Sequence, residues 1–219
     1  MRRRFTSGDM NDEMPVIHVV DDDASFRSAV SRLLRAAGYQ VALYPSAAQL
    51  LDSLPAPARG CILLDVRMPG VTGPQLQDRL AGMGYATPIV FLTGHGDLPT
   101  SVRAIKAGAE DFLAKPVAKD TLLAAIERAL ERYDEMHARS ARLQALRDLA
   151  AALTPREREV FALVVRGKLN KQIAHELGTS ERTIKAHRHS IMQKLKVHSV
   201  AELVSMAERL GMLVASGEA

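Results

Sequence analysis

Short apolar runs alternate with amphipathic stretches through the first half of the chain. Runs of three to six apolar residues with polar, Gly or Pro ends are typical of strands buried on both faces of a parallel sheet. The sequence therefore predicts five strands, at Val16–Val20, Gln40–Tyr44, Cys61–Asp65, Pro88–Thr93 and Asp111–Leu113.

Helical patterns separate these runs. Apolar residues recur at three-to-four spacing, and another helix begins near Lys119. The earlier predicted helices are Ser25–Ala37, Ser46–Leu54, Gly73–Ala81 and Leu98–Ala107. Repeated strand–helix alternation favours a parallel sheet with helices on both faces. We therefore predict an α/β doubly wound domain with a five-stranded parallel sheet over residues 14–119.

A long helical segment follows this domain. Residues 120–153 contain neither Gly nor Pro, and they carry apolar residues such as Leu122, Ile126 and Leu130 at helical spacing. The stretch 121–153 has five basic and five acidic side chains. It is predicted to be a helical linker that includes the last helix of the first domain. This pattern fits two alternatives. The helix could pair with another helix in a short coiled coil, or it could be a connector whose apolar side is covered by the rest of the chain.

The remaining chain is wholly helical in pattern. Thr154 precedes Pro155 and Glu157, which together are typical of a capped helix start. Four helices are predicted, at Pro155–Arg166, Asn170–Leu177, Ser180–Leu195 and Val200–Leu210. We therefore expect an all-α four-helix domain over residues 154–213, with disordered tails at 1–13 and 214–219.

Composition narrows the class of protein. The 219 residues are 47% hydrophobic and 25% charged, as in ordinary globular proteins. No apolar run reaches the roughly 18 residues that a membrane span needs. The basic residues 2–4 precede no apolar segment, which argues against a secretory signal. Cys61 has no second cysteine to pair with, as expected in a reducing cytoplasm.

The net charge of +4 is concentrated at one end. Residues 154–219 carry 11 basic and seven acidic side chains. In residues 1–120 and in residues 121–153 the numbers of basic and acidic side chains are equal. This asymmetry favours nucleic-acid contact by the C-terminal domain.

Polar side chains stand where the predicted strands end. Asp21 and Asp22 follow the first strand, Asp65 ends the third, Thr93 ends the fourth, and Lys115 follows the fifth. The carboxyl ends of parallel strands share one edge, where ligands bind in doubly wound folds. We therefore expect these five side chains to meet.

Phosphoryl transfer is the chemistry that suits this set. A carboxylate can attack a phosphoryl group and form an aspartyl phosphate. Clustered carboxylates repel one another unless a hard divalent cation lies between them, which implies Mg²⁺. Lys115 adds positive charge, and the Thr93 hydroxyl can donate to a phosphoryl oxygen.

These motifs resemble the receiver domain of two-component response regulators, which has the CheY-like or flavodoxin-like fold. The matching stretches are Val-Val-Asp-Asp-Asp at 19–23, Leu-Leu-Asp-Val-Arg-Met-Pro-Gly at 63–70, Val-Phe-Leu-Thr-Gly-His-Gly-Asp at 90–97 and Asp-Phe-Leu-Ala-Lys-Pro at 111–116. The resemblance covers about residues 14–135. It implies phosphorylation by a sensor histidine kinase.

The resemblance also assigns roles at the metal site. It implies that Asp65 is the phosphoacceptor and that Asp22 and Asp65 ligate Mg²⁺. Asp21 would act mainly through water, and the backbone carbonyl of Arg67 would complete the site.

A switch is implied by the same resemblance. Lys115 would pair with the phosphoryl group, Thr93 would be the switch hydroxyl, and Phe112 the switch aromatic. When Thr93 moves towards the phosphoryl oxygen, the ring can fill the vacated volume, coupling a charge event to repacking. Arg67 and His95 lie two residues beyond Asp65 and Thr93, and we expect them to set the lifetime of the phosphate.

The C-terminal domain has the pattern of a helix-turn-helix, in which Gly178-Thr179 forms the turn between two predicted helices. Its second helix carries four basic residues and one acidic residue over 180–195. Such a helix can place its first half in the major groove.

Residues 150–213 resemble the LuxR-type domain in particular. The matching stretches are 153–160, 170–174, 183–189 and 194–195. The resemblance implies base contacts by Lys185, Ala186 and His189. It implies contacts to the DNA backbone by Asn170, Lys171, Thr183, Arg188 and Lys194.

Together the two domains resemble the NarL/FixJ family, and the Gly-His-Gly-Asp stretch and the long connector favour the FixJ side of that family. That resemblance implies a cytoplasmic transcriptional regulator, not an enzyme, which binds DNA, acts with RNA polymerase and forms a homodimer when phosphorylated. Two other hypotheses remain open. One is a phosphatase with an aspartyl-phosphate intermediate, although Arg67 stands where that class has a second Asp. The other is a DNA-binding protein independent of phosphorylation.

Overall fold

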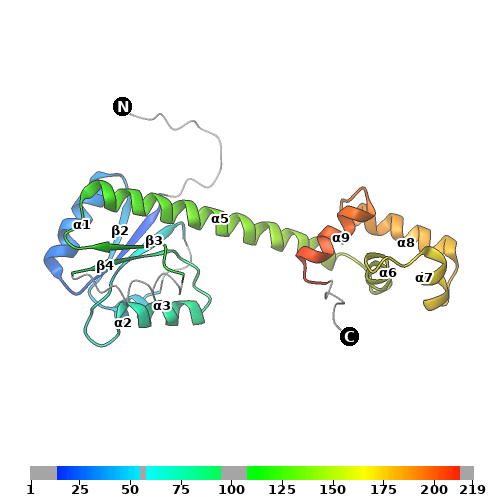
Figure 1. Ribbon diagram of the computed structural model, residues 1–219, viewed down its shortest axis with the longest axis horizontal. Helices are drawn as coiled ribbons and strands as arrows, with labels where there is room; N and C mark the ends of the chain where they lie inside the picture. Colours follow the sequence, from blue (N-terminus) through cyan, green and yellow to red (C-terminus); the bar gives the residue numbers. More distant parts are fainter. Residues whose placement is uncertain (1–13, 55–57, 95–107, 213–219) are drawn as a thin grey trace, which may run out of the picture. The chain divides into compact units, whose positions relative to one another are not determined.

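A computed structural model describes residues 14–54, 58–94 and 108–212 of the chain (Figure 1). The predicted helix Leu98–Ala107, His95 and the two predicted tails, 1–13 and 214–219, fall outside these ranges. The chain divides into two compact units, Met1–Met136 and His137–Ala219.

The N-terminal unit is built on a five-stranded parallel sheet with the order β2-β1-β3-β4-β5. The strands are β1 (Val16–Val20), β2 (Gln40–Tyr44), β3 (Gly60–Asp65), β4 (Ile89–Thr93) and β5 (Asp111–Ala114). The chain therefore starts in the second position of the sheet and winds both ways from it. This confirms the predicted doubly wound fold.

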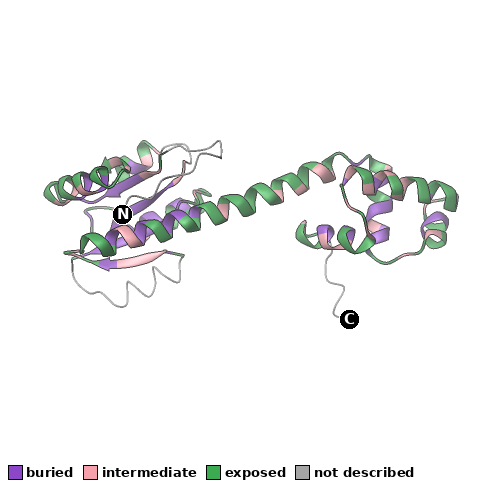
Figure 2. Ribbon diagram, turned by 90° about the horizontal axis from the view of Figure 1, so that it is seen from above, coloured by how far each residue is buried: buried purple, intermediate pink, exposed green. Residues whose placement is uncertain are grey.

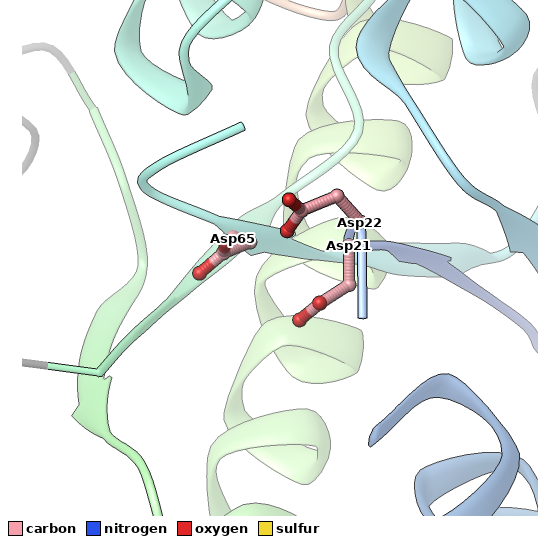
Figure 3. A group of neighbouring side chains, drawn as sticks. All are labelled: Asp21, Asp22 and Asp65. Atoms are coloured by element: carbon pink, nitrogen blue, oxygen red, sulfur yellow. The ribbon is translucent and has the colours of Figure 1, made fainter. Parts of the chain in front are cut away.

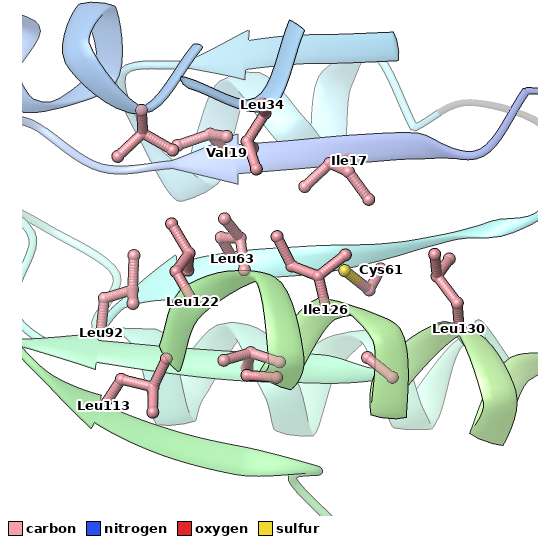
Figure 4. Close-up of a cluster of buried hydrophobic side chains, with 14 residues drawn as sticks. Ile17, Val19, Leu34, Cys61, Leu63, Leu92, Leu113, Leu122, Ile126 and Leu130 are labelled. Carbon is pink, nitrogen blue, oxygen red and sulfur yellow. The ribbon is translucent and has the colours of Figure 1, made fainter. Parts of the chain in front are cut away.

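Helices cover both faces of the sheet. The helices of this part of the chain are α1 (Ala24–Ala36), α2 (Ala47–Asp52), α3 (Gly73–Gly82) and α5 (Lys119–Ala151). Leu34 of α1 and Leu122 and Ile126 of α5 pack on one face, against strand residues such as Leu63 (Figure 4). Residues of α2 and α3, including Leu50, pack in a second cluster. Two apolar layers thus sandwich the sheet.

The edge strands differ from the prediction of burial on both faces. Every residue of β3 and β4 is buried, as predicted for central strands. Gln40 and Leu43 of β2 are exposed, and Asp111 and Phe112 of β5 are only half-buried. These strands lie at the two edges of the sheet, where neighbouring elements cover them less completely. The prediction was wrong for these two strands because an apolar run does not reveal its position in the sheet.

The start of α3 is packed against the end of β3. A Cβ atom at Gly73 would lie 2.5 Å from the backbone oxygen of Asp65 and 2.9 Å from Cε1 of Phe91. The helix begins with a capping box between Thr72 and Gln75. Only a residue without a side chain allows this close approach, which holds the backbone around Asp65 in place.

Helix α5 is continuous over 33 residues. Leu122, Ile126, Leu130 and Tyr133 are buried at helical spacing, so one stripe of its first half faces the sheet. The boundary between the two compact units falls inside this helix. Residues 137–142 of this helix are exposed, and the middle of α5 is coloured mostly as exposed in Figure 2.

The C-terminal unit is helical, as predicted. It contains the end of α5 together with α6 (Pro155–Val165), α7 (Asn170–Glu176), α8 (Glu181–Lys194) and α9 (Val200–Arg209). Its core includes Phe161, Ile173, Ile184, Ile191 and Leu203. The capping box between Thr154 and Glu157 and the Ser180 cap were both predicted, and both are confirmed. In the described part of the chain, no helix combines the length and apolar character that a membrane crossing requires.

Candidate functional site

The carboxyl ends of four strands bring the predicted polar residues to one edge of the sheet. In the parallel register, Val20 lies beside Leu64, Asp65 beside Leu92, and Thr93 beside Ala114. The residues that follow these strand ends therefore converge, although almost a hundred positions separate Asp21 from Lys115. This is the juxtaposition that was predicted from the shared carboxyl edge of a parallel sheet.

Three carboxylates form the acidic part of the site. Oxygen atoms of Asp21, Asp22 and Asp65 all lie within 4.8 Å of one another (Figure 3). Asp21 is fully buried and Asp65 is 6% exposed, whereas Asp22 is exposed. Asp21 Oδ1 accepts a hydrogen bond of 2.9 Å from the backbone N–H of Asp23, which itself caps α1. Clustered carboxylate oxygens are the donors that Mg²⁺ prefers, so the residues fit that ion.

The ammonium group of Lys115 completes the site. Its Nζ donates to Asp21 Oδ2 at 2.5 Å and to Asp65 Oδ1 at 3.0 Å. It also lies 4.3 Å from the ring centroid of Phe26. A positive charge is thus fixed beside the carboxylate that was predicted to accept a phosphoryl group.

Burial and charge act in opposite directions on the pKa values here. Burial raises the pKa of Asp65 above its ordinary value, and the hydrogen bond and charge of Lys115 only partly offset this effect. Burial alone would lower the pKa of Lys115, but its hydrogen bonds to Asp21 and Asp65 outweigh burial and raise it. The lysine therefore stays charged at neutral pH.

The two predicted switch residues lie on neighbouring strands. Thr93 ends β4 with 2% exposure, and its backbone oxygen accepts from the N–H of Lys115 at 2.6 Å. Phe112 on β5 is half-buried, and its ring centroid lies 6.0 Å from that of Phe91. The hydroxyl-bearing residue and the aromatic ring are therefore both built into the edge that carries Lys115.

Two contacts at this site were not predicted from the sequence. Phe26 and Arg27 lie in the first turn of α1, and Arg27 donates to the backbone oxygen of Asp21 at 2.6 Å. Their only signal was position, because both closely follow the Asp triplet at 21–23 and so sit near the end of β1. Arg67, which was predicted to influence the site, is exposed two residues beyond Asp65.

A second candidate surface lies on α8 of the C-terminal unit. Lys185, Ala186 and His189 are exposed on this helix, as base-contacting residues must be. Ile184 and Ile191 on the opposite side are buried in the helical core. The helix thus presents a polar, basic face while its apolar face fixes its orientation.

The candidates for contacts to the DNA backbone fall into two groups. Lys171 and Thr183 are exposed. Arg188 instead donates to Asn170 Oδ1 at 3.0 Å, and Lys194 donates to Glu157 Oε2 at 2.6 Å. These three candidates are held by bonds inside the unit, which the helical pattern did not reveal.

Glu157 has a larger role than the predicted helix cap. It is 4% exposed and accepts from Lys194, from the Ser190 hydroxyl at 2.6 Å and from the backbone N–H of Thr154 at 2.8 Å. Hydrogen bonds from Lys194, Ser190 and Thr154 lower the pKa of Glu157 to about 2. The carboxylate therefore links the start of α6 to the end of α8.

Comparison with known proteins identifies two families along the chain. Residues 17–127 match the response regulator receiver domain, and residues 151–207 match the bacterial regulatory proteins of the luxR family. The two matches coincide with the acidic site and with the helical unit, respectively.

Several known proteins match the chain over about nine-tenths or more of their own length. The chain is 45% identical over 201 residues to the response regulator protein TmoT of Ectopseudomonas mendocina, covering 92% of this chain and 91% of TmoT. It is 43% identical over 197 residues to the transcriptional regulatory protein FixJ of Bradyrhizobium diazoefficiens, covering 90% and 96%. The solved structure of the response regulator StyR matches with a TM-score of 0.77 and 46% identity, over 90% of this chain and 100% of StyR.

Proposed function

The chain belongs to the response regulators that join a receiver domain to a LuxR-type DNA-binding domain, and we propose that phosphorylation of Asp65 controls its action on transcription. As a member of this family it is a DNA-binding transcriptional regulator. The observation that carries the proposal for Asp65 is the cluster of three carboxylates with an ammonium group 3.0 Å from Asp65.

The proposed reaction transfers a phosphoryl group from a phosphohistidine of a sensor kinase. An oxygen of the Asp65 carboxylate attacks phosphorus and forms a P–O bond, while the P–N bond breaks and its electron pair stays on the imidazole nitrogen. The product is an acyl phosphate on Asp65. Water later attacks phosphorus and regenerates the carboxylate with release of inorganic phosphate, a step that the receiver assists.

Mg²⁺ held by Asp21, Asp22 and Asp65, with the backbone carbonyl of Arg67, would neutralise negative charge on the phosphoryl oxygens. Asp21 and Asp65 are the buried members of this set, so their oxygens are shielded from bulk water. Lys115 contributes a second positive charge from within the protein. Its position between Asp21 and Asp65 supports a role in pairing with the new phosphoryl group.

Phosphorylation would be reported through Thr93 and Phe112. The Thr93 hydroxyl donates to a phosphoryl oxygen, and the ring of Phe112 moves towards the space that Thr93 leaves. Both residues lie on adjacent strands, β4 and β5, and Phe112 is only half-buried, which supports its capacity to move. The repacked edge then favours a homodimer, which brings two DNA-binding domains to paired half-sites.

The DNA contacts are proposed to come from α8 and α7. Lys185, Ala186 and His189 face bases. The proposed contacts to the DNA backbone are those of Asn170, Lys171, Thr183, Arg188 and Lys194. The bound protein acts in the cytoplasm, together with RNA polymerase.

Labelling with acetyl phosphate tests this proposal. Wild type should gain one phosphoryl group in the presence of Mg²⁺, and chelation of the metal should abolish the gain. Asp65→Asn should not be labelled, whereas Asp52→Asn, which alters an exposed residue at the end of α2, should be labelled like wild type. Equal labelling of both variants would reject Asp65 as the acceptor.

Dimerisation is tested separately. Light scattering after size exclusion should give a larger mass for wild type with acetyl phosphate and Mg²⁺ than for Asp65→Asn under the same conditions. An unchanged mass for fully phosphorylated wild type would reject the dimer step alone.

A further inference from the structure

The side chain of Phe26 lies against the reactive edge of the receiver. Phe26 is in the first turn of α1 and is half-buried, with its ring packed against the apolar cluster between α1, α5 and the sheet. The Nζ atom of Lys115 lies 4.3 Å from the centroid of this ring. An ammonium group at that distance is attracted by the negative face of an aromatic ring.

Lys115 is held from more than one direction. Asp21 and Asp65 accept its hydrogen bonds at 2.5 and 3.0 Å, and the side chain of Lys115 is only 18% exposed. Low exposure strengthens the attraction between the ammonium and the ring, because less water competes for the charge. The ring is therefore a third partner of the ammonium, and an uncharged one.

The two kinds of partner respond differently to phosphorylation. Both carboxylates are proposed ligands of Mg²⁺, which competes with the ammonium for them, and Asp65 loses its own negative charge to the acyl phosphate. The ring of Phe26 undergoes neither change, because it carries no charge and is not a proposed ligand of Mg²⁺.

On this basis we infer that Phe26 is a positioning residue, which keeps the ammonium of Lys115 beside Asp65 while Mg²⁺ competes for the oxygens of Asp21 and Asp65 and the phosphoryl group is transferred. The inference rests on the proposed function of Asp65. Phe26 does not touch the reacting atoms in this arrangement and acts only through Lys115.

The helix that carries Phe26 is itself anchored at the site. Asp23 caps α1 by accepting from the backbone N–H of Ser25 at 2.8 Å and of Phe26 at 3.2 Å. Arg27 donates to the backbone oxygen of Asp21 at 2.6 Å. The backbone that carries the ring is therefore held in place relative to Asp21, as a positioning role requires.

Initial rates of labelling by acetyl phosphate with Mg²⁺ test the inference. Phe26→Leu keeps an apolar side chain but removes the ring, and it should slow labelling about fivefold, equivalent to about 1 kcal/mol. Phe26→Tyr retains the aromatic face and should stay within about twofold of wild type. Tyr39→Leu is the matched control, because Tyr39 packs against the same cluster but follows the end of α1, and its rate should also stay near wild type.

Nuclear magnetic resonance gives a second measurement, which uses only the wild-type protein and so does not depend on whether a variant folds. The ε-methylene protons of Lys115 should be shifted upfield by the ring current of Phe26. Absence of this shift, a wild-type labelling rate for Phe26→Leu, or equal slowing in Phe26→Leu and Phe26→Tyr would overturn the inference. If wild type itself is not labelled, the proposed function fails; if wild type is labelled and Phe26→Leu keeps its rate, only the inference fails.

Discussion

Glu157 provides a quantitative prediction for the stability of the DNA-binding unit. Its carboxylate is 4% exposed and accepts hydrogen bonds from Lys194, Ser190 and Thr154. Replacing it with glutamine keeps the size of the side chain but removes the negative charge. The ammonium of Lys194 then loses its anionic partner.

The size of the effect follows from the pKa of Glu157, which falls from 4.5 to about 2 in the folded protein. A tenfold change in proton affinity corresponds to about 1.36 kcal/mol, so the charged form contributes at most about 3 kcal/mol. The Lys194 side chain is 35% exposed, so water screens part of this interaction. We therefore expect Glu157→Gln to lower the free energy of unfolding by about 2 kcal/mol at neutral pH.

The pH dependence has a definite sign. Because folding lowers the pKa of Glu157, its stabilisation is complete above pH 4.5 and is lost as the pH falls towards 2. Glu157→Gln should lack this part of the acid sensitivity. Both effects should be localised to the C-terminal unit, which contains all four residues of the network.

Hydrogen exchange of the full chain, read by mass spectrometry, measures the free energy of local opening in α6 and α8. Glu159→Gln is the matched control, since Glu159 lies on the same helix and forms an exposed pair with Arg156 at 2.7 Å. It should change stability by less than about 0.5 kcal/mol. Equal effects of the two substitutions, or the same loss of stability in acid for Glu157→Gln and wild type, would refute the reasoning.

Three further substitutions, the first of them paired with a control, test other parts of the structure. Gly73→Ala should lower the free energy of unfolding of the receiver by about 2 kcal/mol or more, because its Cβ would lie 2.5 Å from the Asp65 backbone oxygen. Gly82→Ala is the control, since a Cβ there meets no atom within 4 Å and should be tolerated. Urea unfolding compares the two variants. Arg59→Ala breaks an exposed pair with Asp134 at 2.7 Å and should cost no more than about 1 kcal/mol in the same assay. Lys185→Ala should weaken binding to a target DNA by about 1–3 kcal/mol and relax base preference, and titrations with variant DNA sequences would reveal an unchanged preference if the proposed base contact is wrong.

The arrangement of the sheet and of its polar edge was predictable because both depend on period and order along the chain. Apolar runs marked the strands, and the topology then required Asp21, Asp65 and Lys115 to meet. The unequal burial of strand edges was not predictable, since Leu43 of β2 is as apolar as the residues of β3 yet is exposed.

Contacts between side chains from different helices were the least predictable part. Lys194 has the spacing of an outward-facing basic residue, but the fold of the C-terminal unit places Glu157 within 2.6 Å of it. Phe26 reads in the sequence as an ordinary apolar residue of a helix. Its position over Lys115 depends on how the start of α1 meets the end of β5, which no local pattern encodes.

Identification of the phosphorylated residue tests the central claim most directly. Borohydride reduces an acyl phosphate to an alcohol, so a phosphorylated aspartate becomes homoserine, which peptide mass spectrometry locates. After incubation of the full chain with acetyl phosphate and Mg²⁺, the account predicts homoserine at position 65. Homoserine at another aspartate, or none in a protein that has gained a phosphoryl group, would contradict it.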